Sequence, residues 1–84
     1  MKHIKIYTIN SCQFCKDAVN LLKSKGIKFE EINISENEFY MLNELAKTSG
    51  IHTLPQVFAD KKFIGGCNDI YQLESQNKLD EALS

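Results

Sequence analysis

The chain has 84 residues, of which 43% are hydrophobic and 25% charged, with a formal net charge of −1 at pH 7. This length predicts one domain with one core over residues 1–84, and the ten basic residues, all lysines, form no basic patch of the kind that nucleic acid binding requires. No apolar run reaches the roughly 18 residues of a membrane span, and the N-terminus lacks the apolar core of a secretory signal, so we expect a cytoplasmic protein without a membrane partner.

The first half of the chain reads as strand, helix and strand. Residues 3–9 alternate, with Ile4, Ile6 and Thr8 on one face, which is the period of a strand. Apolar residues then recur at helical spacing from Cys15, and we expect this helix to have its N-cap at Asn10 or Ser11 and to end at residue 26. Residues 28–34 alternate again and predict a second strand.

The second half reads as helix, hairpin and helix. Residues 35–38 match a capping box, which predicts a helix that has Phe39, Leu42, Leu45 and Ala46 at helical spacing and ends at Gly50. A strand at 56–59, a polar turn and a strand at 63–64 form a hairpin. Asn68 and Asp69 are the expected N-cap of a third helix, followed by a short turn that carries Leu79 and Leu83.

This order, β-α-β-α-β-β-α, predicts an α/β fold. The first two strands form a parallel βαβ unit with a right-handed crossover, and the hairpin completes a four-stranded mixed sheet with flanking helices.

Two cysteines stand at the junction of the first strand and the first helix. Cys12 at the mouth of the helix and Cys15 one turn inside share a face and lie within reach of a disulfide. A thiolate at Cys12 would face unpaired N–H groups and the positive end of the helix dipole, so Cys12 is the candidate nucleophile and Cys15 the candidate resolving thiol.

The alternative use of this pair is half of a zinc site. Zinc needs four ligands, and outside the pair the chain offers Cys67, His3 and His52, none of them in a second close pair. A strand before the pair and a helix after it favour a redox dithiol, and an odd number of cysteines argues against a disulfide framework. We therefore predict no metal site, and we interpret Cys67 as a small apolar residue and His52 as an exposed loop residue.

Two further motifs lie later in the chain. Thr53-Leu54-Pro55 precedes the hairpin, and Gly65-Gly66-Cys67-Asn68-Asp69 precedes the third helix. The first can be a simple strand entry, because proline is common at a strand's first residue. The second can be a turn and a cap, or a place where a ligand approaches exposed N–H groups. Each motif alone leaves both interpretations open.

Together, the three motifs resemble glutaredoxins, the small glutathione-dependent members of the thioredoxin superfamily, over nearly the whole chain. The resemblance implies a thioredoxin-like fold and a glutathione-dependent thiol-disulfide oxidoreductase. Cys12 would attack a glutathione mixed disulfide or a protein disulfide, and Cys15 or a second glutathione would resolve the intermediate. Glutathione would be a co-substrate of a monomer with no tightly bound cofactor. Its protein partners would be glutathionylated or disulfide-containing proteins such as ribonucleotide reductase.

The resemblance also implies a glutathione site. Phe14 stands where the family usually has tyrosine, flanking the reactive sulfur. Thr53, Leu54 and Pro55 match the cis-proline loop, in which the residue before proline offers backbone hydrogen bonds to the peptide. Asn68 and Asp69 match the segment that holds the γ-glutamyl end, with helix N–H groups for its carboxylate and Asp69 for its ammonium group.

Two positions depart from the family pattern. Gln13 replaces the proline that commonly follows the first cysteine, and some family members without this proline assemble a [2Fe-2S] cluster between two protomers. Ile9 replaces a lysine that often contacts the glycyl carboxylate, a contact for which Lys16 or another lysine is a candidate. The alternatives are therefore a glutathione-ligated [2Fe-2S] carrier, or a redoxin reduced by thioredoxin reductase.

Overall fold

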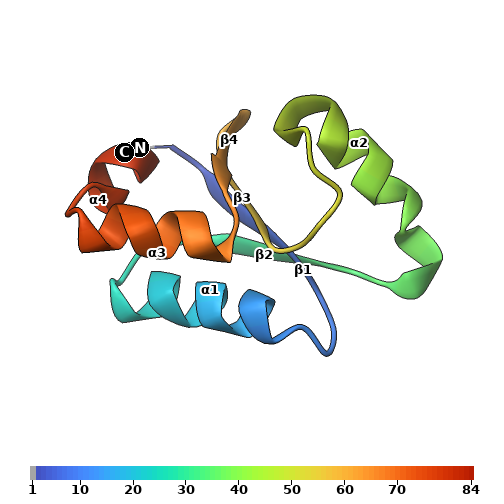
Figure 1. Ribbon diagram of the computed structural model, residues 1–84, viewed down its shortest axis with the longest axis horizontal. Helices are drawn as coiled ribbons and strands as arrows, with labels where there is room; N and C mark the ends of the chain where they lie inside the picture. The colour runs from blue at the N-terminus through green and yellow to red at the C-terminus, as the bar shows by residue number, and fades with distance from the viewer. Residues whose placement is uncertain (1) are drawn as a thin grey trace.

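The computed structural model describes residues 2–84 as a four-stranded sheet with helices on both faces (Figure 1). The strands lie in the order β2-β1-β3-β4, with β2 parallel and β3 antiparallel to β1, and β4 antiparallel to β3. The strands are β1 (Ile4–Ile9), β2 (Glu30–Ile34), β3 (Gln56–Ala59) and β4 (Lys62–Gly65). The helices are α1 (Gln13–Ser24), α2 (Tyr40–Ser49), α3 (Cys67–Ser75) and α4 (Leu79–Leu83), with a 3-10 turn at Glu36–Glu38. The predicted fold class is confirmed.

The main core lies between the sheet and the layer of α1 and α3 (Figure 1). Ile4, Ile6 and Thr8 are at most 4% exposed, so the face predicted from the alternation of β1 is the buried one. Helices α1 and α3 lie side by side, and the Tyr71 hydroxyl donates to the carbonyl oxygen of Asp17 at 3.0 Å. Burying this apolar surface is the main source of the fold's stability. The core side chains from the sheet and helices are Ile4, Ile6, Ala18, Val19, Leu21, Leu22, Val57, Ala59, Cys67, Ile70, Leu79 and Leu83.

The opposite face of the sheet carries α2 and an aromatic cluster. The ring of Phe58 meets that of Tyr7 edge-on, with centroids 5.6 Å apart, and lies 5.4 Å from that of Phe63. Helix α2 has no buried residue. Its predicted packing residue Phe39 is 44% exposed and precedes the helix, because the capping box at Ser35 opens the 3-10 turn and α2 begins only after that turn.

Helix starts differ from the sequence expectation at two places. Cys12, not Asn10 or Ser11, is the N-cap of α1, and Gly66 is the N-cap of α3. Asn68 and Asp69 lie inside the first turn of α3, where an Asp69 carboxylate oxygen accepts the Gly66 N–H at 2.8 Å. This is the reciprocal half of a capping box, which places the acid three residues after the cap. The predicted C-terminal turn is the short helix α4.

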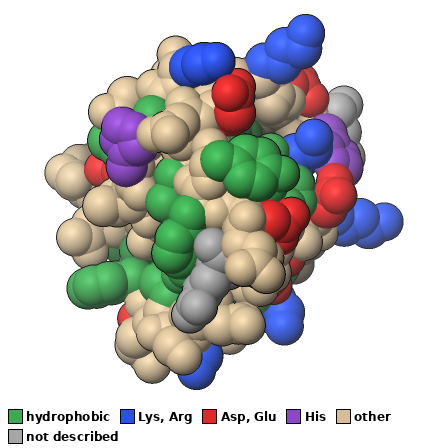
Figure 2. Space-filling model, turned by 90° about the vertical axis from the view of Figure 1, so that its right-hand side faces the viewer, with side chains coloured by type: hydrophobic (Ala, Val, Ile, Leu, Met, Phe, Trp, Pro, Cys, Tyr) green, Lys and Arg blue, Asp and Glu red, His purple; other side chains and the backbone are tan. Residues whose placement is uncertain are grey.

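The end of the molecule that holds α2 and the turn between β1 and α1 carries an apolar band. Figure 2 shows hydrophobic side chains gathered across the centre of this face, with most of the charged side chains around its margin. No helix within residues 2–84 is long and apolar enough to cross a membrane.

Candidate active site

The first cysteine occupies the start of α1. A turn at Asn10 and Ser11, with Ser11 in the left-handed region at φ 61°, leads the chain from β1 into the helix. Cys12 then adopts extended backbone angles, and its Sγ accepts the N–H of Cys15 at 3.1 Å. A sulfur thus fills the capping role that serine, threonine, aspartate or asparagine oxygen usually fills. Cys12 remains partly exposed.

The second cysteine is buried beneath the first. Cys15 is 2% exposed, and burial, followed by its hydrogen bond with Cys12, raises the pKa of its thiol to about 12. Both cysteines are free thiols in the structure. At neutral pH the site therefore offers an accessible sulfur at Cys12 and a neutral, shielded thiol at Cys15. A thiolate is the reactive form in thiol-disulfide exchange, so this asymmetry suits a nucleophile and a resolving thiol.

A cavity of about 390 Å³ collects the residues that the resemblance assigned to glutathione. Phe14, 59% exposed, forms one wall, and Thr53, Leu54 and Pro55 form another. The Leu54–Pro55 peptide bond is cis, as the resemblance implied. The lining residues, which also include three that the sequence analysis did not assign to a site, are Phe14, Ile51, Thr53, Leu54, Pro55, Gly66, Cys67, Asn68 and Asp69. We call this the Phe14 cavity.

The start of α3 closes the Phe14 cavity. Asn68 and Asp69 are exposed there, and the bond from Gly66 N–H fixes the Asp69 carboxylate. Gly65 makes this arrangement possible, because it lies at φ 153° and an added Cβ would collide with the Cβ of Asp69. The free N–H groups and partial positive charge of a helix start favour an anionic ligand group here, and the Asp69 carboxylate favours a cationic one.

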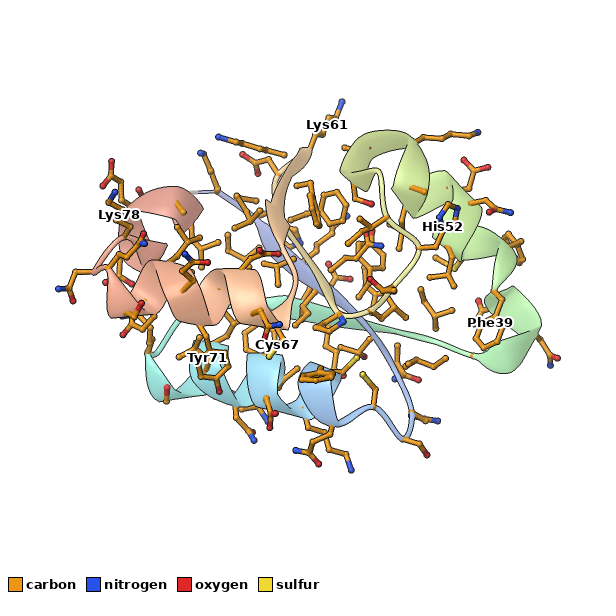
Figure 3. The ribbon with its side chains drawn as sticks, in the orientation of Figure 1. Phe39, His52, Lys61, Cys67, Tyr71 and Lys78 are labelled. Carbon is orange, nitrogen blue, oxygen red and sulfur yellow. The ribbon has the colours of Figure 1, made fainter. Side chains whose placement is uncertain are left out.

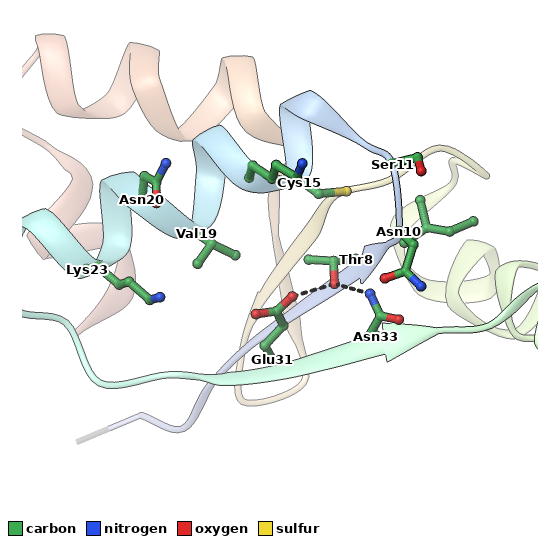
Figure 4. A pocket seen from close by; sticks show the side chains of 11 residues that line it. Thr8, Asn10, Ser11, Cys15, Val19, Asn20, Lys23, Glu31 and Asn33 are labelled. Carbon is green, nitrogen blue, oxygen red and sulfur yellow. Dashed lines mark hydrogen bonds between the residues drawn. The ribbon is translucent and has the colours of Figure 1, made fainter.

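A second cavity, of about 330 Å³, opens beside Cys15 (Figure 4). Its floor is the buried Thr8, whose hydroxyl donates to Glu31 Oε2 at 2.8 Å and accepts from Asn33 Nδ2 at 3.2 Å. These bonds join β1 to β2. The alternation that placed Thr8 on the same strand face as Ile4 and Ile6 did not predict them. Ile9, Lys16 and Lys23 also line this cavity, whereas no lysine lines the described Phe14 cavity.

Of the two remaining candidates, Cys67 lines the Phe14 cavity and His52 does not. Cys67 is 8% exposed at the start of α3, over α1, and burial raises the pKa of its thiol (Figure 3). His52 is exposed beside α2 and lines neither cavity (Figure 3). Among the side chains that the structure describes, no three from His, Cys, Asp or Glu cluster in a way that could hold a metal ion.

The fold and the cysteine pair define a thioredoxin-like thiol protein, and comparisons with known proteins assign its family. The Glutaredoxin family model matches residues 4–64. Glutaredoxin 3 of Escherichia coli (strain K12) is 42% identical over 83 residues, with 99% of each chain covered. The chain belongs to the glutaredoxin family and is a glutaredoxin-type thiol oxidoreductase.

Solved structures agree with this assignment. The solution structure of a Brucella melitensis glutaredoxin has a TM-score of 0.84 and 38% identity, covering 99% of this chain and 89% of that one. The crystal structure of a buckwheat glutaredoxin-glutathione complex has a TM-score of 0.88 and 23% identity, covering 98% and 76%. At 23% identity, the similarity to the buckwheat structure shows the fold alone.

Proposed function

We propose that the chain is a glutathione-dependent thiol-disulfide oxidoreductase that reduces glutathione mixed disulfides and protein disulfides through Cys12 and Cys15. The observation that carries this proposal is the pairing of an accessible, helix-capping Cys12 sulfur with a buried Cys15 thiol. Support comes from the Phe14 cavity, in which the N–H groups and the Asp69 carboxylate at the start of α3 suit the oppositely charged groups at the γ-glutamyl end of glutathione.

For a glutathione mixed disulfide with glutathione as the only reductant, the proposed reaction has two steps. The Cys12 thiolate attacks the glutathione sulfur of the mixed disulfide. A Cys12–glutathione disulfide forms, the substrate S–S bond breaks, and the substrate thiolate leaves with the electron pair and is protonated by solvent. A second glutathione thiolate then attacks the bound glutathione sulfur, which gives glutathione disulfide and returns Cys12 as a thiolate.

Protein disulfides require the second cysteine. After Cys12 attacks a protein disulfide, Cys15 loses its proton to solvent and attacks Cys12 Sγ. The Cys12–Cys15 disulfide forms and the protein thiolate leaves. Two glutathione molecules then reduce this disulfide and become glutathione disulfide.

The binding roles follow from the cavity. We expect the Leu54 backbone to pair with the peptide of glutathione and the Phe14 ring to flank the reacting sulfurs. The N–H groups at the start of α3 suit the γ-glutamyl carboxylate, and Asp69 suits its ammonium group. We expect a monomer acting in the cytoplasm, with glutathionylated or disulfide-containing proteins, such as ribonucleotide reductase, as partners.

The test is turnover of a small glutathione mixed disulfide, coupled to glutathione reductase and NADPH. We expect Cys12→Ser to abolish turnover and Cys15→Ser to retain it, with reduction of protein disulfides lost in both variants. Thr48→Val, on the exposed surface of α2 and outside both cavities, is the control. Full turnover by Cys12→Ser would refute the assignment of the nucleophile.

Gln13 supports a second candidate function, a glutathione-ligated [2Fe-2S] carrier. In place of the rigid proline of many relatives, Gln13 begins α1 and its Nε2 donates to Asp17 Oδ1 at 2.8 Å. Anaerobic incubation with iron, sulfide and glutathione would then give visible absorption and a dimer on gel filtration. A colourless monomer would exclude the carrier. Rapid NADPH oxidation with thioredoxin reductase and a protein disulfide, without glutathione, would instead favour the reductase-fed alternative suggested by Ile9.

A further inference from the structure

A buried glutamine stands directly behind one wall of the Phe14 cavity. Gln56 follows Pro55 as the first residue of β3, pairs with Tyr7 in the sheet and is 0% exposed. Its side-chain Nε2 donates to the carbonyl oxygens of Ile51 at 3.1 Å and Thr53 at 3.0 Å. One amide group, held by the sheet, therefore fixes two points of the loop at 51–55.

The bond to Thr53 sets the direction of the next N–H group. The only cis bond among the described residues is Leu54–Pro55, so the Thr53–Leu54 peptide is trans. In a planar trans peptide the C=O and the N–H point in opposite directions. Because the Thr53 carbonyl faces Gln56 beneath the loop, the Leu54 N–H faces away from it. No hydrogen bond within residues 2–84 uses this N–H, and Leu54 lines the Phe14 cavity.

The same glutamine carries an unfavourable feature. Its Oε1 is buried and has no hydrogen-bond partner among the described residues. An unsatisfied buried acceptor destabilises a folded protein, and an apolar side chain of similar length would avoid that cost. The two donated bonds are the feature of Gln56 that an apolar side chain could not replace.

From this geometry we propose that Gln56 is a positioning residue, which holds the Thr53 carbonyl inward so that the Leu54 N–H faces the Phe14 cavity and pairs with a peptide carbonyl of the substrate. The ligand class is a cysteine-containing peptide such as glutathione. The inference rests on the proposed function and adds to it the origin of the loop's orientation. Gln56 itself does not touch the substrate.

The experiment compares wild type with Gln56→Met, which keeps the length of the side chain and removes both donors. For a glutathione mixed disulfide, we expect KM to rise about tenfold while kcat stays within about twofold, since a factor of ten corresponds to one lost hydrogen bond of ordinary strength. Alkylation of Cys12 by iodoacetamide, which needs no peptide contact, should keep its wild-type rate. Val57→Ala is the matched control, because it weakens the same buried strand without reaching the loop.

The possible outcomes separate this inference from the proposed function. Wild-type turnover with an unchanged KM in Gln56→Met would overturn the positioning role alone. A parallel loss of turnover and of alkylation in Gln56→Met would also overturn it, since it would show general disruption of the site. A wild type without glutathione turnover would overturn the proposed function together with this inference. If Gln56→Met does not fold, Gln56→Asn, whose amide is too short to reach both carbonyls, carries the same expectation.

Discussion

The backbone N–H of Cys15 donates to the Sγ of Cys12 at 3.1 Å, so the sulfur of one active-site residue caps the helix that carries the other. A hydroxyl can replace the sulfur in this role, whereas a methyl group cannot. We expect Cys12→Ala to have a free energy of unfolding about 1 kcal/mol below that of Cys12→Ser. Urea unfolding of both variants under reducing conditions measures the difference, and equal stability would show that the cap contributes nothing.

The buried Cys15 thiol should make the stability of the reduced chain depend on alkaline pH. Burial raises the pKa of this thiol from 9.0 to about 12, so between these values the unfolded chain loses a proton that the folded chain keeps. The stabilising contribution is therefore complete below pH 9 and is lost as the pH rises toward 12. Urea unfolding at several pH values should show a steeper decline in wild type than in Cys15→Ala. Parallel curves would contradict the assignment.

Gly65→Ala should damage ligand binding more than stability alone would explain. The added Cβ would displace Asp69 and with it the bond to the Gly66 N–H, which together shape the start of α3. We expect KM for a glutathione mixed disulfide to rise about tenfold or more. Gly50→Ala is the control, because Gly50 also has a positive φ but an open surrounding at the end of α2. An equal effect of both substitutions on KM would refute this role of Gly65.

Thr8→Val tests the polar floor of the second cavity. Valine has nearly the shape of threonine, but it removes a buried hydroxyl that bonds to Glu31 and Asn33. We expect the free energy of unfolding to fall by about 1–2 kcal/mol, as for the loss of a buried hydrogen-bonded group. Thr48→Val on the exposed surface of α2 should change stability by less than about 0.5 kcal/mol. Thermal or urea unfolding compares the two.

Much of the fold is readable from the sequence because its signals are local. The alternation at Ile4, Ile6 and Thr8 and the helical spacing from Cys15 gave the correct elements and faces. The helix starts were less predictable, because several adjacent residues could serve as caps. Of Asn10, Ser11 and Cys12, the cap is Cys12, whose sulfur is not among the commonly preferred capping groups.

The candidate site was likewise only partly predictable from the sequence. The motifs at Phe14, Leu54 and Asp69 could be assigned to one cavity by resemblance, and the structure brings them together there. The bond from Thr8 to Glu31 joins residues 23 apart in the sequence and depends on the register of their two strands, which no local pattern encodes. The contacts of Gln56 depend on the path of the loop before it, so the sequence predicted a strand at this position but no partner for the side chain.

The absence of buried residues in α2 has a consequence for local unfolding. A helix that contributes no fully buried side chain can open with a small fraction of the global free energy, so its amide hydrogens should exchange with solvent sooner than those of α1. The chain leads directly from α2 into the loop at 51–55. We therefore expect the two bonds from Gln56 to limit how far fraying of α2 spreads into the loop that forms the cavity wall.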